Sequence, residues 1–379
     1  MRVLVACIAL AACRAGAVQD PATDIRPLVE AGQASYMRGD YEAARQALGG
    51  AWEIAAQTPP GDPVRYDILK RLTSVRAAAG EFADADNFLQ MAITWRENTL
   101  GRDDPKLADD YLISVGLCRG MKDYDRARAV LTRVMALHRM AYSPDSAVIA
   151  DDFSRMGQIF LEQKNVPSAV GSLNAALEIR TKAAGALDPT LVPDLDRLAG
   201  AHITMRAYDK AEDVYRHALV IRETLYGKED ADLIATVDGL AYACFGQKKY
   251  DDAEPMYQRL ISLWIKYVGE DHPMVAMALD KVSTFYAEQK KYDQAKEAGD
   301  RATAIRAHFL ATGLSLQATE QLVEGNKDAA LALYQRALDA IDPPGPVNQE
   351  LKTQIEGIVK SMEPPPSKTP AKKAAVKKK

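Results

Sequence analysis

Apolar residues recur along most of the chain at the three- and four-residue steps that place them on one face of an α-helix. In one stretch, Val237, Leu240, Ala241 and Cys244 follow these steps up to a short polar segment. A second set follows the polar segment at the same steps: Ala253, Tyr257, Leu260, Ile261 and Trp264. The pattern predicts two amphipathic helices joined by a short turn. Because it recurs along the chain, we expect an all-α protein.

The register of this pattern is marked by an aromatic residue followed three positions later by alanine. The pairs are Tyr41/Ala44, Phe82/Ala85, Tyr124/Ala127, Tyr208/Ala211, Tyr250/Ala253 and Tyr292/Ala295, with degenerate copies at Val166/Ala169 and Lys327/Ala330. The spacing between successive markers is constant to within a single position, except that the last copy arrives early. Only a small side chain fits where two helices cross closely, so we expect the eight alanines at such crossings.

Helix boundaries follow the same period. Prolines recur in one slot, which suits the first turn of a helix because the missing N–H would have no partner there. Glycines recur four residues earlier, where a left-handed cap would end the preceding helix. The two sets are Pro63, Pro105, Pro189 and Pro273, and Gly101, Gly185, Gly227 and Gly269.

These residues resemble tetratricopeptide repeats, and the units of about 42 residues resemble the variant of kinesin light chains, in which the second helix is about two turns longer. The segment Val268–Pro273 and the dipeptide Ile221-Arg222 are close to that family's pattern. The first helices, however, carry Asp or basic residues where that family usually has asparagine pairs. Its recognition of cargo peptides is therefore not transferred to this chain.

The resemblance implies a right-handed α-solenoid of about eight helical hairpins over residues 28–341, each packed on its neighbours. The expected repeats begin near residues 28, 63, 105, 147, 189, 231, 273 and 312. Residues 347–362 are expected to form a C-terminal capping helix. Residues 363–379 hold six lysines and one glutamate among Pro and Ala. That tail lacks the apolar content to fold, and we expect it to be disordered.

The N-terminus has the pattern of an export signal, with Arg2 before an apolar run too short to remain as a membrane anchor. Cleavage after Ala17 would leave a linker at 18–27 and a periplasmic or secreted protein. The residues before Cys13 resemble a bacterial lipobox, which implies lipid attachment at Cys13 and a membrane-anchored lipoprotein. Both outcomes stay open, and so does a third, a cytoplasmic protein with an apolar, disordered N-terminus. No later stretch is apolar enough to predict a transmembrane helix.

Residues that usually carry chemistry are scattered. The five histidines occur singly, without the spacing of a zinc site, and neither a nucleophile elbow nor a phosphate-binding loop occurs. Cys118 and Cys244 occupy the same slot three repeats apart, so we expect two buried free thiols. The sequence predicts no enzyme, no metal and no cofactor.

Acidic residues form one pattern. Six aspartates recur on the first helices, which line the concave groove in tetratricopeptide folds: Asp67, Asp109, Asp151, Asp196, Asp238 and Asp280. Arg71, Arg155, Arg197 and Lys281 lie beside them. One interpretation is an ordinary solvated face with weak local ion pairs. The other is a groove for a basic peptide or protein segment, with Tyr242 and Phe245 as apolar contacts.

The favoured function is a non-catalytic scaffold of the bacterial cell envelope that binds a peptide or protein segment in the groove. The alternative is an envelope tether whose cationic tail holds anionic polymer, lipid or nucleic acid without a specific nucleic-acid site. A further hypothesis is that the chain's own tail occupies the groove, because linkage gives it a high effective concentration.

Overall fold

Helices account for the regular structure of the described chain. The computed structural model describes residues 21–342 and 348–362, which hold sixteen α-helices, three short 3₁₀ helices and no strand. The all-α prediction is confirmed. In chain order the helices are α2 (Pro21–Met37), α3 (Tyr41–Ala55), α4 (Pro63–Ala78), α5 (Phe82–Leu100), η1 (Pro105–Leu107), α6 (Ala108–Gly120), α7 (Tyr124–Ala141), α8 (Ala147–Glu162), α9 (Val166–Ala184), η2 (Pro189–Leu191), α10 (Val192–Thr204), α11 (Tyr208–Tyr226), η3 (Ala231–Leu233), α12 (Ile234–Gly246), α13 (Tyr250–Val268), α14 (Pro273–Glu288), α15 (Tyr292–Val323), α16 (Lys327–Ala340) and α17 (Gln349–Met362).

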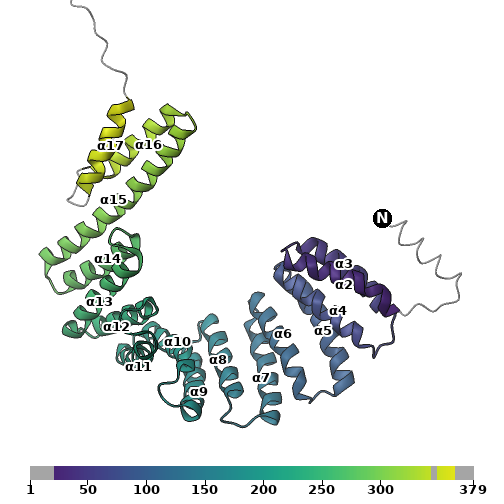
Figure 1. The fold of residues 1–379 in the computed structure, drawn as a ribbon. Coiled ribbons are helices and arrows are strands. Elements are labelled where there is room, and N and C mark those ends of the chain that lie inside the picture. The colour runs from purple at the N-terminus through teal and green to yellow at the C-terminus, as the bar shows by residue number, and fades with distance from the viewer. Residues whose placement is uncertain (1–20, 343–347, 363–379) are drawn as a thin grey trace, which may run out of the picture. The chain divides into compact units, whose positions relative to one another are not determined.

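The helices stack as consecutive pairs in each of two compact units, which divide after Met205. In the first unit, α2 to α10 pack each against the next along the chain; in the second, α11 to α17 do the same (Figure 1). We call α2, α4, α6, α8, α10, α12 and α14 the first helices, and the helix that follows each of them the second helix. This stacking of helix pairs is the solenoid architecture that the repeats predict.

Several expectations fall wholly or partly outside the described residues. The export signal at 1–17, the lipidation site at Cys13 and the lysine tail at 363–379 lie outside them. The expected linker at 18–27 lies partly outside, and α2 begins within it, at Pro21. No helix in the described part of the chain has the length and apolarity needed to cross a membrane.

Alanine recurs at one buried position of the repeats. The eight marker alanines are buried: Ala44, Ala85, Ala127, Ala169, Ala211, Ala253 and Ala330 have no exposed surface, and Ala295 is 7% exposed. Both Cys118 and Cys244 are free and buried, as predicted. Burial raises the pKa of the Cys244 thiol to about 11, so that it stays protonated at neutral pH.

Helix ends use the recurring Pro and Gly residues. Pro63 and Pro273 begin α4 and α14, whereas Pro105 and Pro189 begin the 3₁₀ helices η1 and η2. The backbone conformation of the recurring glycines differs from that of the expected left-handed cap. Gly101, Gly185, Gly227 and Gly269 have φ of 84° to 94° but ψ of 152° to 175°, so the chain leaves each helix in an extended direction. That backbone region is nearly exclusive to glycine.

The turn inside each hairpin contains a residue with left-handed backbone. Gly39, Gly80 and Gly325 fill this slot in the first two hairpins and the last. In the five turns between them the slot holds a basic residue with φ of 57° to 62°: Lys122, Lys164, Arg206, Lys248 and Lys290. A side chain at this φ brings Cβ close to the following carbonyl oxygen, which costs roughly 1–2 kcal/mol. Five consecutive turns therefore carry local strain.

Replacing Lys248 with glycine is expected to raise the free energy of unfolding by about 1 kcal/mol, because glycine adopts a positive φ without this clash. Urea unfolding followed by circular dichroism measures the change. The reciprocal variant Gly80→Ala, where φ is 78°, should be destabilised by a similar amount. An unchanged or lower stability of the Lys248→Gly protein would contradict the assignment of strain.

The seventh and eighth repeats differ from the prediction, because no helix break occurs near residue 312. Instead α15 runs for 32 residues without interruption. The positions that match Gly269 and Pro273 one period later are Ala311 and Ser315. Neither residue ends a helix, so the second helix of one repeat continues as the first helix of the next.

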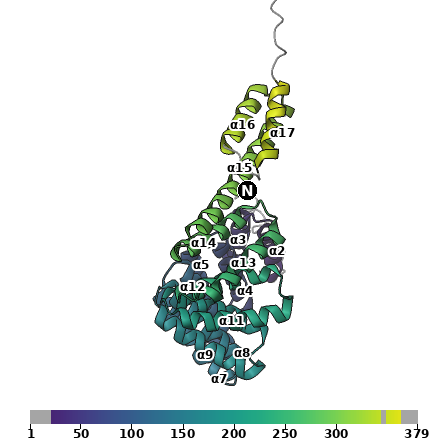
Figure 2. The same ribbon diagram turned by 90° about the vertical axis from the view of Figure 1, so that its left-hand side faces the viewer.

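The end of the described chain is a small three-helix assembly. The second half of α15 packs against α16, and α17 packs against both (Figure 2). Their shared core includes Leu314, Tyr334, Ile341 and Ile355. The helix α17 lies within the range expected for a capping helix.

Candidate functional site

The six predicted carboxylates all lie on first helices. Asp67 on α4 and Asp109 on α6 are exposed, and the other four, Asp151, Asp196, Asp238 and Asp280, are half-buried. The first four belong to the first unit and the last two to the second. Asp67, Asp109 and Asp151 share one slot of successive repeats, and the other three share a slot three residues further along the first helix.

Most of these carboxylates bind a basic side chain of the same chain. Arg71 pairs with Asp67 at 2.8 Å between Nε and Oδ2. Arg306 pairs with Asp280 at 2.6 Å between Nη1 and Oδ2. Two further ion pairs are Asp151–Arg180 and Asp238–Lys281. The face formed by the first helices consequently carries mixed charge.

Two hollows on this face lie between neighbouring first helices, each with a volume of about 230 Å³. The hollow between α2 and α4 is lined by Gln33, Tyr36, Lys70, Arg71 and Ser74, with Leu48 of α3 beneath them. We call the other, between α8 and α10, the α8/α10 hollow. Its lining includes Asp151, Ser154, Arg155 and Gln158 of α8, Arg180 of α9, and Pro193, Asp194 and Arg197 of α10.

Arg180 fixes the floor of the α8/α10 hollow. Its side chain is 12% exposed and bonds to Asp151, Ser154 and Asp194 at once. The rim carries two more arginines: Arg155, 3.6 Å from Asp152, and Arg197, 3.0 Å from Asp194. Their side chains are 41% and 37% exposed. They can therefore turn toward a ligand, whereas Arg180 is held in place.

Beneath this face runs a column of buried aspartates that the sequence analysis did not identify. Asp110, Asp152 and Asp194 occupy the same slot in three successive repeats, and each side chain is at most 1% exposed. Each bonds to a side chain on the preceding second helix, 14 residues earlier in the sequence: Arg96, His138 and Arg180. In the next repeat, Arg222 donates to Thr236 at 2.6 Å.

Among the three buried aspartates, Asp110 accepts the largest number of the hydrogen bonds described here. Its carboxylate accepts hydrogen bonds from Tyr66, Lys70 and Arg96 at 2.6 to 3.0 Å. Burial and this bond to Asp110 raise the pKa of Tyr66. In the next repeat, burial raises the pKa of Asp152 although His138 opposes the shift. A buried charge is tolerated when it is paired and hydrogen-bonded, so these contacts hold neighbouring repeats in register.

The two predicted aromatic contacts have different environments. Tyr242 on α12 is 45% exposed and meets the ring of Tyr208 edge-on at 6.1 Å. Phe245 is partly buried and packs against the core, with its ring 5.9 Å from that of Phe285 and 6.4 Å from that of Tyr250. Tyr242 is therefore the more accessible of the two.

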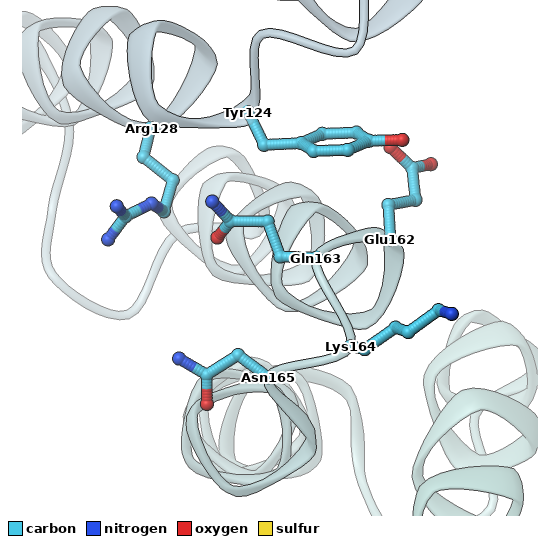
Figure 3. A pocket seen from close by; sticks show the side chains of 6 residues that line it. All are labelled: Tyr124, Arg128, Glu162, Gln163, Lys164 and Asn165. Carbon is cyan, nitrogen blue, oxygen red and sulfur yellow. The ribbon is translucent and has the colours of Figure 1, made fainter.

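A larger hollow of about 450 Å³ lies at the hairpin turns, between the start of α7 and the α8–α9 turn (Figure 3). Its charged groups largely serve the protein's own packing. Arg128 stacks over Phe160 at 5.5 Å and bonds to Asp125, and Glu162 is paired with Arg119. The first-helix face holds the six predicted carboxylates and two hollows, and we take it as the candidate binding surface.

Comparison with known proteins identifies the repeats. Two tetratricopeptide-repeat family models match residues 195–232 and 232–308. Among curated proteins, none matches the chain. The chain therefore contains tetratricopeptide repeats, as its sequence predicts, and the solved structures that it resembles include kinesin light chain-like proteins.

Three solved structures illustrate the likeness in fold. A signal transduction ATPase with a tetratricopeptide repeat sensor, from Pyrococcus horikoshii, is 14% identical with a TM-score of 0.53, over 73% of this chain and 41% of that chain. A putative kinesin light chain with TPR-like repeats from Podosopora anserina is 16% identical (TM-score 0.48; 54% and 96%). BtubC from P. vanneervenii is 16% identical (TM-score 0.47; 63% and 91%).

Proposed function

We propose that the chain is a non-catalytic scaffold that binds a peptide or protein segment along its first-helix face. The observation that carries this proposal is the α8/α10 hollow, where Arg155 and Arg197 flank an ordered floor. A solenoid of helix pairs presents an extended surface for such a segment. The N-terminal pattern at 1–17 favours a bacterial cell envelope location.

The charges of this face bear on the chemistry of the partner. A basic segment would compete with Arg71, Arg180, Lys281 and Arg306, which already occupy four of the six carboxylates. At the α8/α10 hollow the accessible groups are the guanidiniums of Arg155 and Arg197 and the carboxylate of Asp151. That carboxylate is already paired with Arg180, whereas guanidiniums bind further carboxylates in paired hydrogen bonds. The proposed segment therefore presents an acidic group at this hollow.

Site-specific photo-crosslinking in the native envelope tests the location. A photoreactive residue at Gln158, inside the hollow, should give a discrete adduct that is lost when Arg155 and Arg197 are replaced with glutamate. The matched position is Thr132, an exposed residue on the second helix α7. Equal adducts at Gln158 and Thr132, or adducts that survive the arginine substitutions, would refute binding at this hollow.

The lysine tail supports the alternative function of an envelope tether. Residues 363–379 carry a net charge of +5. If the tail is the tether, its removal should abolish envelope association and the steep salt dependence that accompanies binding to a polyanion. If the groove is the binding surface, the Gln158 adduct should persist without the tail. An adduct that strengthens on truncation would indicate that the tail occupies the groove.

A further inference from the structure

The long helix α15 packs on opposite sides in its two halves. In the first half, Ala298, Ala302 and Ile305 are buried in the core shared with α14. In the second half, Ala311, Leu314 and Ala318 are buried against α16 and α17. Ile305 and Leu314 are nine positions apart, and at about 3.6 residues per turn this puts them on opposite faces. Figures 1 and 2 both show α15 running from α14 to the pair α16 and α17.

Large apolar side chains recur on the face of α15 that packs on α14 after α14 no longer covers it. Its continuation is formed by Phe309, Leu316 and Val323, which we call the α15 stripe. These side chains are 54%, 63% and 86% exposed. The ring of His272 lies 6.0 Å from that of Phe309 at the start of the stripe. Beyond that contact, Leu316 and Val323 face solvent.

The spacing of the stripe is that of a helix that packs along another helix. Its members are seven positions apart, which is the repeat by which paired helices keep one seam in contact. Gly313 lies on the same side, and a Cβ built there has no heavy atom within 4 Å. A second helix could therefore approach the backbone closely between Phe309 and Leu316.

We propose that the α15 stripe is the interface of a homodimer, in which two copies of α15 pair antiparallel. With Leu316 on the two-fold axis, Phe309 packs against Val323 of the partner subunit and Leu316 against Leu316 of the partner subunit. An interface of this kind is self-complementary, because the same patch serves both copies.

The charges beside the stripe favour a second copy of the chain as the partner, with its α15 antiparallel. Arg306 lies at its N-terminal end, and Glu320 and Glu324 lie toward its C-terminal end. Arg306 is paired with Asp280, but its side chain is 47% exposed and remains accessible. Antiparallel pairing places Arg306 beside Glu324 of the partner subunit. Parallel pairing would place like charges together, which is destabilising.

Sedimentation equilibrium of the full chain tests dimer formation. The unchanged protein should show a concentration-dependent doubling of mass. Leu316→Glu should raise the dissociation constant at least about 100-fold, because two carboxylates would be buried together on the axis. The control is Leu310→Glu: Leu310 is 54% exposed but lies about 100° around the helix from Phe309, and this variant should dimerise normally.

A monomer at all concentrations up to about 100 μM, well above the micromolar constant of a weak specific complex, would overturn the proposal. So would a Leu316→Glu protein that dimerises like the unchanged one. Thermal unfolding by circular dichroism confirms that both variants fold, since each position is on the surface.

Cysteine crosslinking determines the direction of pairing. In a chain with Cys7 and Cys13 replaced by serine, Leu316→Cys should form a disulfide with itself. Phe309→Cys should crosslink only when mixed with Val323→Cys, because these positions meet across the axis. Self-crosslinking of Phe309→Cys would indicate parallel helices and refute the antiparallel arrangement.

Discussion

Replacing Asp110 with alanine is expected to lower the free energy of unfolding by about 3–5 kcal/mol, the usual cost of removing one partner of a buried ion pair. The Asp110 side chain has no exposed surface, and the side chains of Lys70 and Arg96 are only 23% and 20% exposed. Without the carboxylate, both cations and the Tyr66 hydroxyl lose their shared acceptor. Guanidinium unfolding monitored by circular dichroism measures the loss.

The neighbouring residue provides a matched control. Asp109 has the same side chain on the same turn of α6 but is exposed. Asp109→Ala should change stability by no more than about 0.5 kcal/mol, as is usual for surface substitutions. Similar losses in the two variants would mean that helix propensity or net charge, rather than the buried contacts, determines the effect.

Replacing Gly239 with alanine is expected to cost about 2 kcal/mol through steric overlap in the second unit. A Cβ at this position would lie 2.3 Å from Cζ and 2.6 Å from Cε1 of Tyr215. No pair of non-bonded atoms tolerates such a distance, so the ring or α12 must shift. Thermal unfolding should show a clearly lower midpoint.

Gly171 gives the opposite expectation for the same substitution. It lies inside α9, and a Cβ there has no neighbour within 4 Å. Gly171→Ala should stabilise the protein by about 0.5–1 kcal/mol, because alanine favours the helix. The overlap at Gly239 is confirmed if Tyr215→Leu makes the Gly239→Ala substitution less costly in a double-mutant cycle. Additive losses would exclude a direct clash.

The helix pairs could be predicted because several independent patterns share one period. The Tyr250/Ala253 marker, the glycine at 269 and the proline at 273 all recur at the same interval along the chain. Each pattern has a local physical cause, such as the close crossing of two helices or the end of a helix. Each can therefore be recognised in the sequence without knowledge of the fold. The continuous helix α15 could also have been predicted from the sequence. Ala311 and Ser315 stand at the positions where other repeats have the glycine and the proline of a helix boundary.

The buried aspartates were harder to find because adjacent residues differ in environment. Asp109 and Asp110 both recur one period later, as Asp151 and Asp152, yet the two members of each pair lie about 100° apart around the helix. The sequence shows both columns but does not show which faces the core. The partner on the neighbouring helix shows which aspartate is buried. The offset from Arg96 to Asp110 can be recognised as a recurring pattern only after one such pair has been seen in the structure.

The same limit applies to the charges of the candidate surface. The sequence places Arg71 and Arg155 near the exposed aspartates, but side-chain rotamers decide which charges are neutralised within the chain. The structure pairs Arg71 with Asp67, whereas the ion pair of Asp151 is with Arg180 from α9 rather than with Arg155. Such pairing determines what remains available to a partner.

The short, constant offset in the buried column has an evolutionary consequence. Each buried aspartate and its partner on the preceding second helix lie closer together in the sequence than one repeat period, on either side of the same inter-repeat loop. A gene duplication or deletion of whole units among these three repeats would therefore join another of the partners to another acid at the same offset. This part of the array could lengthen or shorten by recombination without leaving a buried aspartate unpaired.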